Sequence, residues 1–345
     1  MYKRQLLAIK LQSECRKKGY AKATVGTLLS NPTISAFTAS IIDQPEMSTQ
    51  ENTQTRHHQE SLNAPWEIFD FFQSVCKKHQ IPQAQLAIGK SGQVLSGSFG
   101  LNESIKQRPD NRFVAPEQYL FRISCNSKVL TLILGLKLAE LKILNLDDEV
   151  SKYLTALHDV SIWQGVTLRH LFNHRNGLDF SLSTKDISLQ DELVDVVHKI
   201  IPRTIQYAEP GSMFGYSMTG NIIIAHIFEQ LTGESYLQLL TRYVLDPLGI
   251  NLVVTDAPNS AEFVTVGHSI VDGKPMALTP PGHTPALISS GSLGSYMTSR
   301  DLLQVCFALM PKSKGGLGLL TENSIAQVFE KALPVENHPV LVKSG

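Results

Sequence analysis

The residues best suited to chemistry are Cys125 and Lys128, three positions apart in the stretch Phe121-Arg-Ile-Ser-Cys-Asn-Ser-Lys128. On a helix, residues at i and i+3 share a face, with their Cβ atoms about 5–6 Å apart. A thiol there would lie beside an amine at a helix N-terminus, where the dipole and the ammonium favour a thiolate. The pair therefore indicates an activated thiol at the end of a helix. A core cysteine next to a lysine that extends to the surface is the alternative.

The element that must hold this pair follows directly along the chain. The run from Val129 to Leu141 is apolar on nearly every side of a helix, which is typical of a buried helix. We therefore predict that Cys125 and Lys128 lie at the N-terminal end of a central, buried helix.

Composition narrows the range of functions. The chain has 345 residues, of which 42% are hydrophobic and 18% are charged, and its formal net charge is zero. Without a basic surplus, nucleic acid is not an expected partner. No apolar run reaches the ~18 residues of a membrane span.

The other cysteines are scattered and show no metal-ligand spacing. Cys76 is the main competitor of Cys125 for the role of reactive thiol, because two lysines follow it. Cys306 lies in an apolar helical run, so we expect it to be buried with a raised pKa. Cys15 completes the set of four.

The segment from Phe121 to Asp148 resembles the S-x-x-K region of the penicillin-recognising serine hydrolases, which include class C β-lactamases, DD-peptidases and related esterases. The family pattern F-R-I-G-S-x-S-K is followed by a buried helix, L-x-L-D-D and Y-L. Here the later parts are Leu144-Asn-Leu-Asp-Asp148 and Tyr153-Leu154. The register implies that Cys125 replaces the nucleophilic serine, since neither neighbouring serine is three residues before Lys128.

The second family motif, Y-x-N, corresponds to Tyr216-Ser217-Met218. The resemblance implies that Tyr216 shares the proton transfers with Lys128. It also places Met218 at the substrate-binding asparagine. A thioether cannot donate the hydrogen bond that the asparagine makes to a substrate amide.

The third family motif lies on a strand that lines the pocket and can read K-S-G. The resemblance implies that Lys343, Ser344 and Gly345 bind substrate. A K-S-G also occurs by chance at Lys90-Ser-Gly92, so the match at the end of the chain could be a coincidence.

A further segment, Gly165 to Leu178, resembles the family's I-T-x-R-x-L-L-x-H-x-S-G-L. Thr167 is a suitable helix N-cap and Gly177 a suitable helix end. His170 and His174 are spaced i, i+4, as two zinc ligands could be. No Glu follows His170 as in H-E-x-x-H, and the family holds no metal here, so we interpret both as structural. We expect no metal and no other cofactor.

The resemblance implies an α/β (α+β) fold of the β-lactamase/transpeptidase type: an antiparallel sheet flanked by helices, plus a mostly helical region. We expect a single domain over 64–345, with the sheet part at 64–120 and 285–345 and the helical part at 121–284. The residues themselves predict helices at Ala64–His79, Ser188–Ile201, Ile222–Leu231 and Ser235–Leu245, and strands at Ala84–Gly89 and Gln93–Gly97.

The two ends carry separate expectations. Met1–Gln5 reads like a translated sequencing adapter, so we expect residues 1–46 to be upstream or non-native sequence and Met47 to be the start. Residues 47–63 are expected to be disordered. Val340–Gly345 reads as a strand without a partner, so we expect the domain to be truncated at its C-terminus. No signal peptide is seen, so a cytoplasmic location is expected.

Two functions remain open. The first is an acyl-transfer enzyme, a hydrolase or acyltransferase that acts on an ester, thioester or amide. It would form an acyl-enzyme on Cys125, with Lys128 and Tyr216 as proton-transfer groups. Its partner would be a small-molecule or peptide acyl substrate. The second is a catalytically inactive homologue that acts as a binding protein. A single-base sequencing error at the Cys125 codon is a further alternative.

Overall fold

The computed structural model describes the chain over residues 57–90, 93–99, 119–154, 157, 160–180, 187–188, 191–217, 219–250, 253–254, 265, 267–277 and 295–329. The chain divides into two compact units, Met1–Pro65 and Trp66–Gly345. All packing described below lies within the second unit.

A hairpin forms a two-stranded sheet of its own among the described strands. Strands β1 (Ala84–Lys90) and β2 (Gln93–Phe99) pair antiparallel, with Ala84 opposite Phe99 and Lys90 opposite Gln93. This confirms the two predicted strands. Helix α4 (His57–Lys78) precedes them and begins seven residues before the predicted start at Ala64. The structure includes residues 57–63, which we expected to be disordered, in this helix, and a polar segment that contains Gln and Glu can form one.

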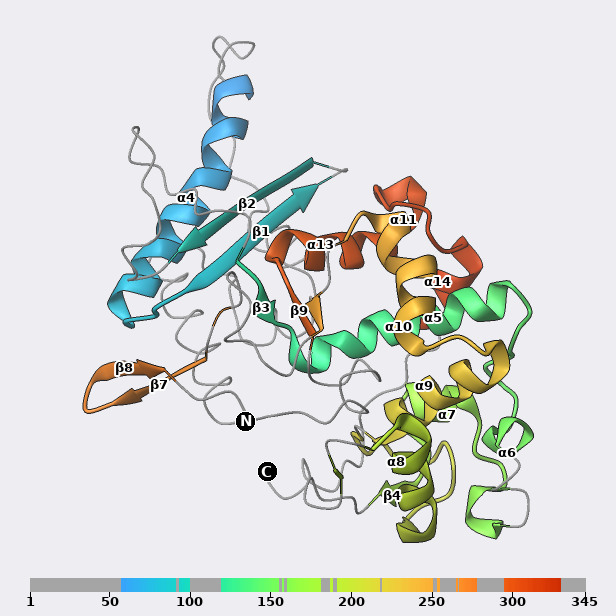
Figure 1. The fold of residues 1–345 in the computed structure, drawn as a ribbon. Helices are drawn as coiled ribbons and strands as arrows, with labels where there is room; N and C mark the ends of the chain where they lie inside the picture. Colours follow the sequence, from blue (N-terminus) through green and yellow to red (C-terminus); the bar gives the residue numbers. More distant parts are fainter. Residues whose placement is uncertain are drawn as a thin grey trace. The chain divides into compact units, whose positions relative to one another are not determined.

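The two faces of the hairpin are covered by different helices (Figure 1). Leu86 and Ile88 pack with Phe69 of α4, and a Cβ added at Gly97 would lie 2.8 Å from the Phe69 ring. On the other face, a Cβ at Gly89 would lie 2.5 Å from Phe307 of α13 (Ser299–Ala308). The absence of side chains at these glycines lets α4 and α13 approach the strands closely.

The predicted buried helix is present and central. A 3₁₀ turn, η1 (Ser124–Asn126), leads into α5 (Ser127–Glu140), and α5 buries residues on several sides. Its buried hydrophobic residues are Leu130, Ile133, Leu134, Leu136 and Leu138. Helix α5 lies beside α9 (Thr219–Thr232) and α10 (Tyr236–Leu240), as Figure 1 shows. This packing fixes the position of the residues at its N-terminal end.

A short sheet joins the segment before Cys125 to a distant part of the chain. Strand β3 (Phe121–Arg122) pairs antiparallel with β9 (Ser295–Met297), which also pairs with β6 (Val253–Val254). The Ile123 N–H donates to the Ser295 carbonyl over 3.0 Å. The backbone that leads into Cys125 is thereby held by residues far away in sequence.

Two predicted helices differ from the structure. The first, predicted at Ser188–Ile201, is α8 (Leu193–Ile200), and it begins after a capping box between Glu192 and Asp195. The second, predicted at Ser235–Leu245, is α-helical only in α10 and continues as a π-helical turn, η6 (Thr241–Leu245). A capping box sets the start of α8, and hydrophobic periodicity does not reveal such a group.

The remaining elements are short. They are α6 (Val150–Tyr153), η3 (Ser161–Trp163), α7 (Leu168–Phe172), β4 (Leu178–Phe180), η5 (Ile201–Arg203), β5 (Thr204–Gln206), α11 (Asp246–Leu248), β7 (His268–Val271), β8 (Lys274–Ala277), η8 (Lys312–Lys314) and α14 (Glu322–Phe329). Strands β4 and β5 pair antiparallel, as do β7 and β8.

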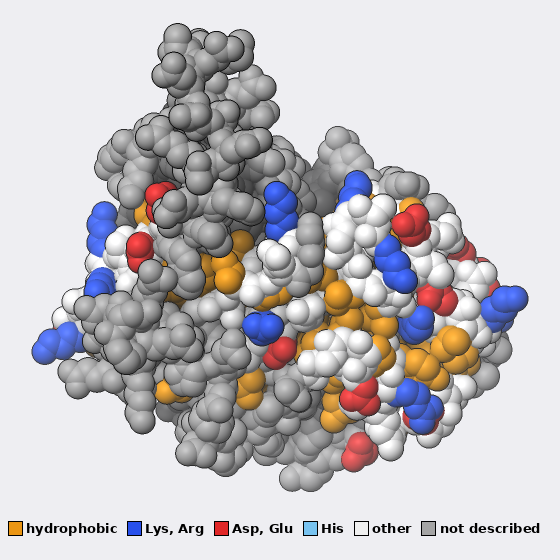
Figure 2. Space-filling view, turned by 90° about the horizontal axis from the view of Figure 1, so that it is seen from above, with side chains coloured by type: hydrophobic (Ala, Val, Ile, Leu, Met, Phe, Trp, Pro, Cys, Tyr) orange, Lys and Arg blue, Asp and Glu red, His pale blue; other side chains and the backbone are white. Residues whose placement is uncertain are grey.

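The described surface carries both charge signs together. In Figure 2, Lys and Arg side chains are interspersed with Asp and Glu side chains, and the described part of this face has no block of one sign. Of the helices that the structure describes, none combines the length and hydrophobicity needed to cross a membrane.

Candidate active site

Cys125 lies exposed in η1, immediately before the buried helix α5. The preceding residue, Ser124, has a left-handed φ of 47°, and its carbonyl accepts a 2.6 Å hydrogen bond from Ser127 Oγ. Such a conformation is strained for a residue other than glycine and persists only where its surroundings enforce it. The turn therefore presents the thiol to solvent at the N-terminal end of a fixed helix.

Lys128 lies one turn further along, with its amine inside the protein. Its Nζ is buried, and no described residue forms a hydrogen bond with it. The Tyr216 ring lies over this amine, with 5.3 Å between Nζ and the ring centroid. Burial lowers the pKa of Lys128, and a negative charge on Cys125 acts in the opposite direction. The amine is therefore easier to deprotonate than an exposed lysine.

Tyr216 completes the predicted group and is about half exposed, at 50%. Desolvation raises its pKa strongly, and a hydrogen bond and negative charge from the Cys125 sulfur raise it further. Its hydroxyl consequently stays protonated at neutral pH. The structure thus brings together Cys125, Lys128 and Tyr216, although Tyr216 lies 88 residues after Lys128 in the sequence.

His174 belongs to this group, and sequence reasoning missed it there. Its ring centroid lies 4.7 Å from that of Tyr216, and its Nδ1 accepts a 3.3 Å hydrogen bond from the Ser217 N–H. Burial, and secondarily the charge of Lys128, lower the pKa of His174 to about 4. The sequence did offer one signal for His174, which is its position in the segment Gly165 to Leu178 that resembles a family motif. The spacing of residues along the chain does not reveal its contact with Tyr216.

His170 and His174 do not form the metal pair that their spacing allows. Helix α7 ends at Phe172, so the two side chains do not share a helix face. The predicted N-cap is confirmed: Thr167 Oγ1 accepts from the His170 N–H over 3.2 Å, and His170 Nδ1 accepts from the Thr167 N–H over 3.3 Å. In the described part of the chain, no three His, Cys, Asp or Glu residues are grouped to hold a metal.

Gly177 does not end α7 as predicted. The chain passes through His174, whose φ is 56°, and reaches Gly177 (φ 71°) five residues after the helix. A Cβ at Gly177 would lie 2.1 Å from the Ala208 carbonyl oxygen. The glycine is needed for this close approach of two loops.

The other cysteines differ from expectation. Cys76, the predicted competitor, is buried, and desolvation raises its pKa to about 11. Cys306 was expected to be buried but is exposed, because the neighbouring Val305 and Phe307 are the residues that α13 turns inward. The protein around its sulfur still raises the pKa of Cys306. Met218, Lys343, Ser344 and Gly345 lie outside the described residues.

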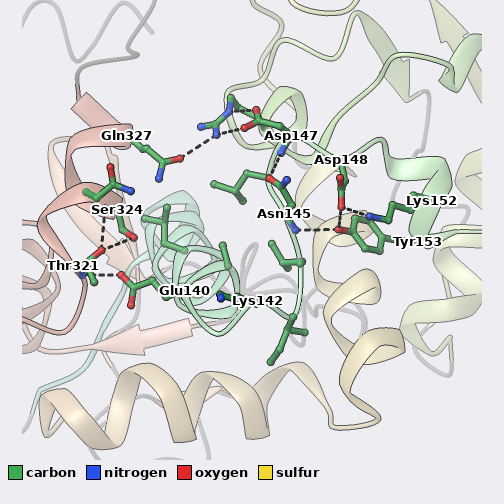
Figure 3. Close-up of a pocket in the computed structure, with 17 residues that line it drawn as sticks. Glu140, Lys142, Asn145, Asp147, Asp148, Lys152, Tyr153, Thr321, Ser324 and Gln327 are labelled. Atoms are coloured by element: carbon green, nitrogen blue, oxygen red, sulfur yellow. Dashed lines mark hydrogen bonds and ion pairs between the residues drawn. The ribbon is translucent and has the colours of Figure 1, made fainter.

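The Leu144–Asp148 segment lies at the opposite end of α5, where it lines a pocket of about 800 Å³ (Figure 3). Asp147 binds Arg169 over 2.6 Å, and Asp148 accepts hydrogen bonds of 2.6 Å from both Lys152 and Tyr153. From Lys128 to the end of α5 is about 18 Å along the helix axis. These acidic residues therefore stabilise the fold and do not reach Cys125.

Comparison with known proteins gives a consistent result. The sequence profile of a family described as Beta-lactamase matches residues 60–345. Penicillin-binding protein 4* of Bacillus subtilis (strain 168) is 29% identical over 187 residues, which are 52% of this chain and 39% of that protein. Protein flp of Staphylococcus aureus (strain NCTC 8325 / PS 47) is 30% identical over 179 residues, 50% of this chain and 34% of that one. The matches thus span well under half of these relatives.

Solved structures agree in fold. EstCE1, described as a hydrolase with promiscuous acyltransferase activity, has a TM-score of 0.58 at 20% identity, and the match covers 74% of each chain. A class C β-lactamase from Rhodobacter sphaeroides has a TM-score of 0.53 at 24% identity, covering 75% of this chain and 68% of that one. The TM-scores show a shared fold, and at identities this low the similarity shows the fold alone.

Proposed function

Because the chain belongs to the β-lactamase family, we propose that it is an acyl-transfer enzyme that forms a covalent intermediate on Cys125. One observation carries the proposal: an exposed thiol, a buried amine and a protonated phenol meet at the N-terminal end of α5. A hydrolase with promiscuous acyltransferase activity shares the fold. An ester, thioester or amide is the substrate class that this chemistry suits.

The proposed reaction moves one proton along three groups. Lys128 takes the proton of Cys125, and the thiolate attacks the substrate carbonyl to form a C–S bond. Tyr216 donates its proton to the leaving group as the bond to that group breaks, and the Lys128 ammonium then reprotonates Tyr216. The lowered pKa of Lys128 and the raised pKa of Tyr216 support these roles. Water or an amine then attacks the thioester and releases the acyl group.

Substrate recognition rests on residues outside the described part of the chain. We propose that Lys343, Ser344 and Gly345 bind the substrate and that Met218 lines the same pocket. Because a thioether donates no hydrogen bond, an acylamide side chain such as that of penicillins would be recognised poorly.

The test is acylation by para-nitrophenyl acetate, followed by intact mass and peptide mapping. We expect one acetyl group on Cys125 and none after Cys125→Ala. Cys306→Ala is the matched control, because among the described cysteines it removes the other exposed thiol and should leave the labelling unchanged. A protein that gains no acetyl group, or gains it on Cys306, would instead support an inactive homologue that binds a ligand.

A further inference from the structure

His174 contacts the chain on both sides of Tyr216. Its carbonyl accepts a 2.7 Å hydrogen bond from the Gly215 N–H, and its Nδ1 accepts a 3.3 Å bond from the Ser217 N–H. Between these two bonds its ring lies against Tyr216, with 4.7 Å between centroids and 46° between planes. One residue thus restrains three consecutive residues of the loop that carries the phenol.

The backbone around His174 is built for this contact. Its φ of 56° is left-handed, a conformation that is strained for a residue with a side chain and persists only where its surroundings enforce it. The next residue, Arg175, binds the same loop: its carbonyl accepts from the Gly211 N–H over 2.7 Å, and its Nη1 donates to the Gly211 carbonyl over 3.3 Å. The strained turn therefore aims the imidazole at the Tyr216 loop.

The hydrogen bond from Ser217 also determines where the imidazole carries its proton. Since Nδ1 accepts, the neutral ring holds its hydrogen on Nε2. A second proton would have to occupy Nδ1 and would face the Ser217 N–H. Among the described residues, the charged and titratable groups that act on the ring are Lys128 from α5 and Tyr216, and Cys125 from η1 interacts in turn with these two. The Lys128 ammonium repels a second cation, so the neutral acceptor form is the one this site favours.

We propose that His174 is a positioning residue that holds the Tyr216 hydroxyl where it can protonate the leaving group while Cys125 becomes acylated. This inference rests on the proposed acyl-transfer function. It assigns His174 no contact with the substrate. Two features of His174 hold Tyr216 and can be changed separately. Nδ1 accepts the hydrogen bond from the Ser217 N–H, and the ring packs against the Tyr216 ring.

The test compares two acetate esters whose leaving groups differ in how strongly they depend on protonation by a general acid. Para-nitrophenolate leaves without a proton, whereas trifluoroethoxide benefits from one. His174→Phe keeps a ring but removes the acceptor, and should slow acylation by trifluoroethyl acetate about tenfold or more while changing the para-nitrophenyl rate less than about twofold. Alkylation of Cys125 by iodoacetamide needs no acid and should keep its rate.

His174→Asn is the conservative variant. Asn tolerates a left-handed φ, and its Oδ1 can accept from the Ser217 N–H, so it should restore most of the trifluoroethyl rate. In a Tyr216→Phe background, His174→Phe should cause no further loss, because both changes remove the same proton transfer.

The outcomes separate the two proposals. Equal losses with both esters, or losses that add to those of Tyr216→Phe, would overturn the positioning role and leave the acyl-transfer function standing. If the wild-type protein is acylated by neither ester while iodoacetamide still labels Cys125, the proposed function fails, and the positioning role is overturned with it.

Discussion

If Cys125 is the nucleophile, as we propose, its thiol changes what its neighbours must contribute. A serine hydroxyl needs a strong base, whereas a thiol ionises more easily beside a cation at a helix N-terminus. The buried amine of Lys128 and the phenol of Tyr216 are arranged around this thiol in the structure. Lys128 can therefore accept the proton of the thiol, and Tyr216 can protonate the leaving group of the substrate, without another base.

The first prediction concerns the amine. Lys128→Met should slow the alkylation of Cys125 by iodoacetamide at pH 7 about tenfold, because it removes the cation that favours the thiolate. Rates of labelling at each cysteine, read by peptide mass spectrometry, measure the effect. Lys137→Met is the matched control, since it removes a lysine that pairs with Glu140 near the other end of α5. Equal rates in the wild type and Lys128→Met would disprove the thiolate–lysine pair.

The second prediction concerns acid stability. The pKa of His174 is about 4 in the folded protein and near 6.5 when unfolded, so the unfolded state binds more protons between these values. The free energy of unfolding should therefore have its full value above pH 6.5 and should fall by about 2–3 kcal/mol as the pH drops to 4. Urea unfolding across this range measures it.

His174→Asn should flatten this dependence, because Asn takes no proton. His79→Asn, which changes an exposed histidine after α4, is the control and should keep the wild-type dependence. If the slope of unfolding free energy against pH is the same in His174→Asn and in the wild type, His174 does not cause the acid lability.

At the scale of elements, α5 is held by hydrophobic contacts together with a small buried hydrogen-bond network. Thr131 Oγ1 and Tyr236 Oη lie 2.7 Å apart, and Asn221 donates to Thr131 over 3.2 Å. These bonds join α5 to α10 and α9. They set the rotation of α5 about its axis, on which the positions of Cys125 and Lys128 depend.

The third prediction tests this network. Thr131→Val conserves shape but removes the hydrogen bond between Thr131 and the Tyr236 hydroxyl and the one that Asn221 donates to Thr131, so it should lower the free energy of unfolding by about 1–3 kcal/mol. Guanidinium unfolding measures the change. Tyr236→Phe should cost less when Thr131 is already Val, since the two residues share one bond. Additive losses would show that the bond does not couple the helices.

At the scale of the molecule, the fold is one that serves several chemistries, and the site decides among them. The family match covers most of the chain, but the curated relatives are matched over well under half of their own length. Their activities therefore do not transfer with the fold. Cys125 and Met218 distinguish this chain from the family pattern.

The fourth prediction follows from these two residues. Turnover of a chromogenic cephalosporin should be below about 1 s⁻¹, the lower end of typical enzyme rates. Met218 offers no donor to the acylamide of the antibiotic. Met218→Asn should increase turnover if that contact limits the reaction, and Met218→Leu is the matched control without a donor. Rapid hydrolysis by the wild-type protein would refute this view of its substrate.

Features that depend on neighbours in sequence could be predicted. A run that is apolar on nearly every side indicated α5, two short segments around a glycine turn indicated β1 and β2, and the Thr167 cap followed from a residue type before an apolar run. The i, i+3 spacing of Cys125 and Lys128 also predicted that the two are neighbours, and the structure places Cys125 in the turn η1 that leads into α5. Local backbone preferences are sufficient for each of these.

The tertiary structure alone decided which distant residues meet. His174 joins Tyr216 across 42 positions because two loops are tied by backbone hydrogen bonds, and no periodicity encodes such a tie. Likewise, Cys76 is buried and Cys306 exposed, because packing against other elements decides which side of a helix faces inward. Spacing along the chain specifies local geometry, whereas the reactivity of a thiol depends on charges and burial that only the assembled fold supplies.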